Sequence, residues 1–150
     1  MKDPDFKKRL VVFCISHQTA VYQTTLQAIR DAEQEAADYG APKDRYDGFR
    51  NQQARKREML GKQLALTENN LRVLAQPFLK QAQQQAMPGA LVVTDQRIFF
   101  IAAGLGVVGF EGGEVAVISA QVPVFAAMRG KKTGEVFSFG GVSHTILQII

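Results

Sequence analysis

Cysteine is nearly absent from this sequence of 150 residues, and so is any long apolar run. The single cysteine, Cys14, excludes an internal disulfide and is typical of proteins from a reducing compartment. No apolar stretch approaches the roughly 20 residues that a membrane-spanning helix needs. The N-terminal stretch MKDPDFKKRL is charged, and the apolar run VVFCI after it is too short for a secretory signal. We therefore expect a soluble, cytoplasmic protein without a membrane partner.

Histidine is also scarce, with two residues, and this limits metal and nucleophile chemistry. Cys14 and His17 are three positions apart on a predicted helix, but two ligands without further partners make a weak metal site. His144 follows Ser143 in a predicted strand, where adjacent side chains point to opposite faces. No spacing favours a Ser-His-Asp or Cys-His arrangement. The sequence therefore predicts that the chain is not an independent enzyme and has no cofactor of its own.

One glycine motif suggests a nucleotide site but lacks the context that such a site requires. Gly104 to Gly109 spell GLGVVG, which matches the dinucleotide-binding pattern G-x-G-x-x-G. That pattern must open a helix and be followed by an acidic residue about 20 positions further on. Here Phe110 is followed by Glu-Gly-Gly, which does not favour a helix, and Ala126 to Arg129 hold no acid. We expect a glycine-rich β-turn region instead.

Glycine is scarce before Met87 and frequent after it, and the composition changes at this point. The first part is rich in Gln, Ala, Lys, Arg and Glu, which favour helices. The second part holds most of the glycines and phenylalanines and many valines, which favour strands and turns. This change predicts two domains, residues 1–86 and 87–150.

The first domain has the residue spacing of two amphipathic helices. An alternating four- and three-residue step, the heptad pattern of a coiled coil, joins Leu60, Leu64, Thr67, Leu71, Leu74 and Phe78. The earlier segment has related spacing at Val11, Ile15, Tyr22, Leu26 and Ile29. Since Gly40 and Pro42 interrupt the helical run, we predict an antiparallel coiled-coil hairpin with its tip at about residues 38–47.

The apolar pattern of the second helix fades toward this tip, where basic residues accumulate. From Pro42 to Lys62 there are seven basic and three acidic residues. Such a segment could contact a polyanion or an acidic protein cleft, or form a solvated helix face. The basic set Arg50, Arg55, Lys56 and Arg57 could contact nucleic acid phosphates directly, although Glu58 and the many glutamines weaken that interpretation.

The second domain has the pattern of a small sheet. Strands are predicted at residues 90–94, 97–103, 114–120, 136–139 and 142–150. Pro123 is suited to the first position of a short helix, and Gly130 to its C-terminal cap. The whole chain is therefore predicted to be α+β, with a mainly antiparallel sheet and one short helix in its second domain. We assign the aromatic residues Phe99, Phe100, Phe125, Phe137 and Phe139 to the core.

The segment from Val117 to Ile150 resembles the C-terminal end of the bacterial Gre transcript-cleavage factors, GreA and GreB. The matching positions are Ile118-Ser119, Pro123, Gly130-Lys131-Lys132, Gly134-Glu135 and Ile146 to Ile150. The order of a long N-terminal hairpin and a small C-terminal domain is also similar. The layout looks most like that of the short Gre-like proteins of Bacteroidetes.

The resemblance implies an FKBP-like C-terminal domain that docks on RNA polymerase while the hairpin enters the secondary channel. On this basis the partner-binding residues are Ser119, Pro123, Gly130, Lys131, Lys132 and Arg50. Nucleic acid would be contacted only indirectly, within the elongation complex. In the family, acidic residues at the hairpin tip help to hold a second Mg²⁺ in the polymerase active site, so the factor is at most a cofactor of cleavage.

This sequence departs from the family at the tip and in the docking motif. The acidic pair Asp-x-x-Glu of the family falls on Tyr39 and Pro42 without a gap, or on Ala41 and Asp44 with one. The remaining candidate acids are Asp38, Asp44 and Asp47, with Asp44 as the candidate ligand of a shared Mg²⁺. Valine replaces serine in the docking Ser-Pro, at Val122-Pro123.

Three hypotheses follow from these departures. In the first, the chain binds polymerase with weak or no stimulation of transcript cleavage. In the second, it is an adaptor for another protein partner and reuses the Gre-like architecture. In the third, it is an active cleavage factor that uses Asp44 with Asp38 or Asp47.

Overall fold

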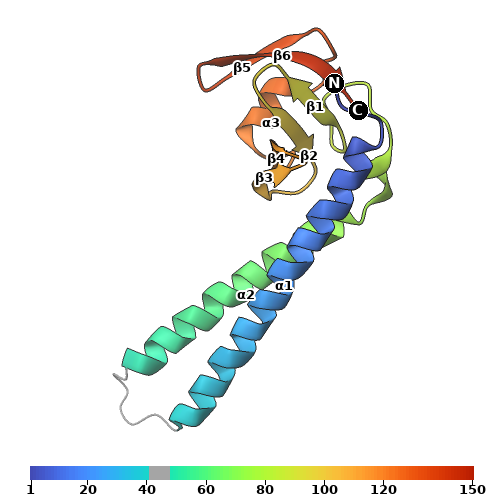
Figure 1. Cartoon of the computed structure of the whole chain (residues 1–150). Coiled ribbons are helices and arrows are strands. Elements are labelled where there is room, and N and C mark those ends of the chain that lie inside the picture. Colours follow the sequence, from blue (N-terminus) through green and yellow to red (C-terminus); the bar gives the residue numbers. More distant parts are fainter. Residues whose placement is uncertain (41–47) are drawn as a thin grey trace. The chain divides into compact units, whose positions relative to one another are not determined.

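The computed structural model of the chain describes residues 1–40 and 48–150 (Figure 1). Two long helices come first, α1 (Phe6–Tyr39) and α2 (Gly48–Leu74). A short 3₁₀ helix, η1 (Pro77–Lys80), follows them. Beyond η1 the chain forms six strands and one further helix, so the predicted α+β class is confirmed. Two of the predicted tip acids, Asp44 and Asp47, lie outside the described residues.

The described chain divides into two compact units. Met1–Ile15 and Arg72–Ile150 form one of them, here called the sheet unit, and Ser16–Leu71 form the other, here called the helical unit. Helix α1 contributes its first turns to the sheet unit and its remainder to the helical unit.

The sheet unit contains a six-stranded mixed sheet in the order β3-β4-β2-β1-β6-β5 (strands labelled in Figure 1). The strands are β1 (Leu91–Thr94), β2 (Ile98–Ile101), β3 (Gly106–Phe110), β4 (Gly113–Ile118), β5 (Val136–Phe139) and β6 (Val142–Ile149). Only β2 and β4 pair in parallel; the other neighbours in the sheet are antiparallel. Five strands and helix α3 (Pro123–Met128) fall where the sequence predicts them.

The sixth strand, β3, corrects the prediction of a β-turn region at Gly104–Gly109. Residues Gly106–Phe110 pair with β4, and Val108 is buried. The turn lies two residues later, at Glu111 and Gly112, whose φ angles of 49° and 77° fit a two-residue hairpin turn. Glycine weakens a strand without excluding it, and here the valines and Phe110 outweigh the two glycines.

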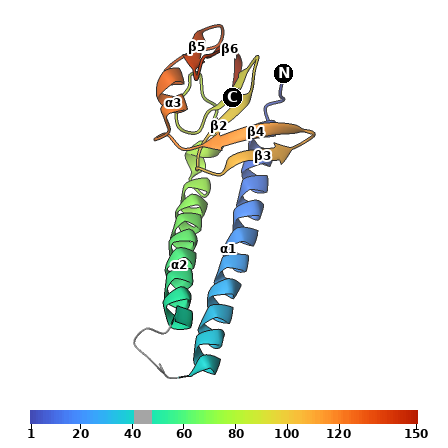
Figure 2. The same ribbon diagram turned by 90° about the vertical axis from the view of Figure 1, so that its left-hand side faces the viewer.

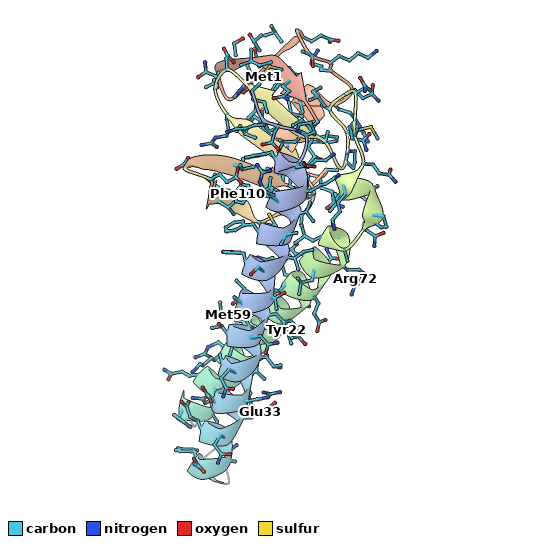
Figure 3. The ribbon with its side chains drawn as sticks, turned by 45° about the vertical axis from the view of Figure 1, so that its right-hand side comes forward. Met1, Tyr22, Glu33, Met59, Arg72 and Phe110 are labelled. Atoms are coloured by element: carbon cyan, nitrogen blue, oxygen red, sulfur yellow. The ribbon has the colours of Figure 1, made fainter. Side chains whose placement is uncertain are left out.

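The two faces of the sheet bury different partners because successive side chains in a strand point to opposite faces. One face packs on the first turns of α1 and on the segment after α2, through Leu91, Phe100, Val115, Val117, Phe6, Leu10, Cys14, Leu74 and Leu79. The other packs on α3, through Val92, Phe99, Ile101, Ala116, Phe137, Ile146, Phe125 and Met128. Figure 3 shows Phe110 beside the first turns of α1, where its ring centroid lies 5.3 Å from that of Phe6.

A buried lysine ties α1 to two distant parts of the sheet unit. The side chain of Lys7 is 1% exposed. Its Nζ donates to the carbonyl oxygens of Gly89 at 2.9 Å and Ile150 at 3.2 Å, and also to that of Gln81. Burial lowers the pKa of Lys7 to about 8. The three carbonyls satisfy all three donors of the ammonium group, so the charge is buried but solvated by the backbone.

In the helical unit, the parts of α1 and α2 between Ser16 and Leu71 lie side by side in opposite directions (Figures 1 and 2). Asn70 Nδ2 donates to Gln18 Oε1 at 3.2 Å. Further along, Gln53 Nε2 donates to Glu35 Oε2 at 3.1 Å. The step from Gln18 to Glu35 along α1 equals the step back from Asn70 to Gln53 along α2, so the pairing is antiparallel with a constant register.

Polar and small residues occupy the centre of this helix pair. The buried positions of α1 here are Gln18, Thr25 and Ala32, spaced by seven, and those of α2 are Gln53, Thr67 and Asn70. The leucines expected at the seam, Leu60, Leu64 and Leu71, are only half-buried. Met59 is 71% exposed (Figure 3). The predicted spacing is therefore present, but the apolar side chains flank the contact between the helices instead of filling it.

Candidate functional site

The distal end of the helical unit is closed by an aromatic contact between the two helices. Tyr39 ends α1, and its ring centroid lies 4.2 Å from that of Phe49 in the first turn of α2. The guanidinium of Arg50 stands 5.7 Å from the centroid of the Tyr39 ring. Gly40 follows with a φ of 87°, a left-handed conformation that commonly ends helices. These residues hold the two ends of the tip segment together.

Asp38 is the one predicted tip acid that the structure describes. Its side chain is exposed, and Oδ1 accepts a hydrogen bond from Gln34 Nε2 at 2.9 Å. Glu35, one turn earlier, accepts from Gln53. Among the described residues, no three His, Cys, Asp or Glu side chains lie close enough to hold a metal ion.

The charges at this end oppose the helix dipoles. Asp38 lies in the last turn of α1, where a helix carries partial negative charge and favours cations. Arg50 lies in the first turn of α2, where a helix favours anions. Neither helix has the complementary charge in that turn. Helix stability therefore does not explain why an acid and a base occupy these two positions.

The residues of the sheet unit that the resemblance predicts to bind a partner lie at the two ends of α3. Ser119 Oγ accepts a hydrogen bond from the Gln121 N–H at 3.3 Å, and Pro123 is exposed at the first helical position. At the other end, Gly130 has a φ of 76° and donates its N–H to Ala86 O at 2.8 Å. Lys131 is half-buried, and Lys132 is exposed. Six helical residues separate the two ends by about 10 Å.

One predicted partner-binding residue, Arg50, stands apart from this set. Arg50 belongs to the helical unit, whereas the other docking residues belong to the sheet unit. Val122 occupies the N-cap position of α3, where no side-chain hydrogen bond caps the helix. A serine there could accept from a free N–H of the first turn, and valine cannot.

Cys14 and His144 are buried among other side chains. Cys14 is fully buried, and burial raises the pKa of its thiol to about 11, so the thiol is protonated at neutral pH. The ring of His144 stacks on that of Phe137, with centroids 4.8 Å apart, and its Nδ1 lies 3.3 Å from Thr94 Oγ1. Ser143, its neighbour in β6, is exposed.

The sequence did not predict a pocket of about 440 Å³ on the α3 face of the sheet. Its floor includes Phe99, Ala116 and Ile118 of β2 and β4. Its exposed rim includes Val107 and Phe139. The assignment of Phe139 to the core is wrong, since its side chain is 43% exposed. Its position beside the predicted Gly-Gly turn could have indicated this, because residues next to a tight turn lie at the end of a sheet.

None of the described helices is both long and apolar enough to cross a membrane. Comparisons of the chain with models of protein families, with curated proteins and with solved structures gave no match.

Proposed function

We propose that the chain is a Gre-like regulator of transcription elongation that binds RNA polymerase through its C-terminal domain. Its helix pair, as a coiled coil, would enter the secondary channel. The observation that carries the proposal is the segment resembling the Gre factors, Val117 to Ile150. This segment forms the end of β4, α3, β5 and β6, and the matched residues Ser119, Pro123 and Gly130 to Lys132 flank one short helix. A long antiparallel helix pair precedes it, as in the family.

The FKBP-like assignment belongs to the same proposal. A curved mixed sheet with a short helix on one face supports it. The proposal does not include prolyl isomerase activity, because a fold does not carry a function with it. The chain acts on the polymerase and is at most a cofactor of the reaction that the polymerase catalyses.

At the tip, we propose weak or absent stimulation of transcript cleavage. A second Mg²⁺ in the polymerase active site needs hard oxygen ligands. Tyr39 occupies one of the family's acidic positions in the ungapped alignment, and its ring packs on Phe49. Asp38 is held by Gln34 on the helix surface. Asp44 is the remaining candidate ligand, alone or with Asp47.

A second candidate function is an adaptor that binds a different protein through the same surfaces. Val122 favours it, because the docking serine of the family is absent. The basic start of α2 favours it as well, since the family carries acids at the tip.

Charge reversal at one end of α3 tests the docking surface. A Lys131→Glu/Lys132→Glu variant should lose binding to RNA polymerase in a pull-down at physiological salt, because two rim cations become anions. Lys80→Glu, an exposed lysine in η1, is the matched control and should bind like the parent chain. If the parent chain itself does not bind polymerase, the proposal fails and the adaptor becomes the leading function.

A further inference from the structure

The pocket on the α3 face exists because α3 is too short to cover that face. Its six residues bury Phe125 and Met128 against the sheet and leave the part nearer β3 open. Val124 of α3 lines one side of the opening. The exposed rim combines Val107 from β3 with Phe139 and Val142 from the β5–β6 turn. We call this pocket the β3 groove.

Opposite edges of the sheet meet at the β3 groove. Strands β3 and β5 are at the two ends of the strand order, yet residues from β3 and from the β5–β6 hairpin line the same pocket. The sheet must therefore be curved, with its concave side toward the groove. A volume of about 440 Å³ is within the usual range for ligand sites, and the lining is mostly apolar.

Strand β3 is an edge strand without the usual protection against pairing with another chain. Its sequence GVVGF contains no charged residue and no proline. Gly106 and Gly109 are exposed. Gly106 has a φ of 80°, which by itself favours glycine, whereas Gly109 has no such constraint and a Cβ built on it would meet no atom within 4 Å. Edge strands are normally blunted by charges, prolines or covering elements, and strand glycines often mark a close approach of another backbone. Glu111, just beyond β3, is engaged by Arg9 Nε at 2.7 Å.

The polar end of the groove favours an acidic group. Arg97 is the charged residue in its lining, and it forms no ion pair with the residues that the structure describes. The nearby acids Asp95 and Glu114 line a separate shallow depression that Arg97 also borders. A carboxylate that enters the groove would therefore meet an available guanidinium, which can bind it with two hydrogen bonds.

His144 adds a polar ring to the lining. The Thr94 hydroxyl donates its proton to Arg97 O at 2.7 Å. The same hydroxyl oxygen accepts from the N–H groups of Gln96 at 3.2 Å and Arg97 at 2.9 Å, and it lies 3.3 Å from His144 Nδ1. Together, Arg97, His144 and Gln96 supply a small set of polar groups beside the apolar floor.

We propose that the β3 groove binds an extended segment of a partner protein, which adds to β3 as a seventh strand. Alternate apolar side chains of that segment occupy the groove, and an acidic side chain pairs with Arg97. This mode of recognition uses main-chain hydrogen bonds for affinity and pockets for alternate side chains for specificity. It is independent of the polymerase proposal, because the docking residues at the ends of α3 are not required for it.

The test is a fluorescence-anisotropy titration of the full chain with a labelled, end-blocked peptide of alternating valine and threonine that carries one aspartate. The control peptide has the same composition with the valines adjacent. Saturable binding of the alternating peptide, about tenfold tighter than that of the control, is expected. Val107→Glu should weaken binding about tenfold, because it places a charge on the rim, and Arg97→Ala should weaken it about fivefold.

The fold supplies a matched control for each variant. Val136 is 50% exposed on the other edge strand, against 51% for Val107, so Val136→Glu should leave binding unchanged. Arg55 is an exposed arginine of α2, so Arg55→Ala is the control for Arg97→Ala and should leave binding unchanged. Amide hydrogen exchange of β3 should slow when the peptide binds, because its free edge groups become hydrogen-bonded.

Four outcomes would overturn the proposal. The first is the absence of saturable peptide binding, and the second is an equal effect of Val107→Glu and Val136→Glu. The third is a chain that is dimeric in solution and becomes monomeric with Val107→Glu, which would identify a second copy as the occupant. Peptide binding without slower exchange in β3 would contradict the added strand.

Discussion

The two units of this protein differ in what they place at their centres. The sheet unit buries apolar side chains on both faces of its sheet. The helical unit buries Gln18, Thr25, Ala32, Gln53, Thr67 and Asn70 between its helices. Burial of apolar area is the dominant favourable term in folding, whereas paired polar groups contribute little net stability. The sheet unit therefore has the stable core, and the helical unit is built for something other than maximal stability.

A large truncation in the sheet core should have the largest effect. Phe100 is fully buried between β2 and the first turns of α1. Phe100→Ala is expected to lower the free energy of unfolding by about 3–5 kcal/mol, through lost burial and the cavity it leaves. Leu64→Ala, at a half-buried position of the helical unit, should cost about 1 kcal/mol. If urea unfolding showed that Phe100→Ala and Leu64→Ala lower the free energy of unfolding equally, the difference between the two units would be contradicted.

A glycine at the junction of the sheet unit gives the next largest effect. Gly89 has a φ of 91°, and a Cβ there would lie 2.9 Å from Phe78 Cδ2. Gly89→Ala should lower the free energy of unfolding by about 2–3 kcal/mol, because strain and overlap add. Gly104→Ala is the control, since a Cβ there meets open space. A thermal midpoint unchanged by Gly89→Ala would contradict both the strain at this φ and the overlap with Phe78.

The buried Lys7 should make stability depend on pH. Because burial lowers its folded pKa to about 8 from the ordinary 10.5, the unfolded chain binds more protons than the folded chain between these values. Stability should therefore rise with pH from about 8 to 10.5, by on the order of 2 kcal/mol relative to a Lys7→Met variant. Urea unfolding of both proteins across this range measures the difference. A constant difference would mean that the three carbonyls hold the lysine pKa near its ordinary value.

The smallest effect is expected in the helical unit, where a double substitution should raise stability instead of lowering it. Gln18 and Asn70 are buried and hydrogen-bonded to each other across the helices. Replacing both with leucine should raise local stability by about 1 kcal/mol, because apolar packing replaces a buried polar pair. Amide hydrogen exchange in α1 and α2 provides the local measurement, and the single variant Asn70→Leu is the control that removes the donor to Gln18 Oε1. Destabilisation by the double change would mean that the polar pair is needed for the helix pair itself.

Much of the fold follows from the sequence because its signals are local. The α+β class follows from the change in glycine content at Met87 and from the alternating pattern of the strands. Pro123 and Gly130 predict the ends of the short helix. Strand β3 was missed because its glycines resemble a turn, and its valines act only when β4 lies beside them. The polar centre of the helical unit was missed because spacing identifies a helix face but not which of two adjacent faces meets the partner.

The candidate site was less predictable than the fold. The roles of Ser119, Pro123 and Gly130 through Lys132 come from the resemblance, whereas their place at the ends of α3 follows from the local helix signals at Pro123 and Gly130. The β3 groove combines residues from Arg97 to His144 that no local pattern connects. Such a site depends on the curvature of the sheet and the shortness of α3, which become visible only in the folded chain.

The most direct test of the central proposal measures polymerase binding and transcript cleavage together on a stalled elongation complex. A Gre-like regulator with a broken acidic pair predicts saturable binding with cleavage little above the level of polymerase alone, and no change in cleavage with Asp44→Ala. Strong cleavage that Asp44→Ala abolishes would contradict the proposal that this chain stimulates cleavage weakly or not at all. Absence of binding would contradict the polymerase proposal altogether.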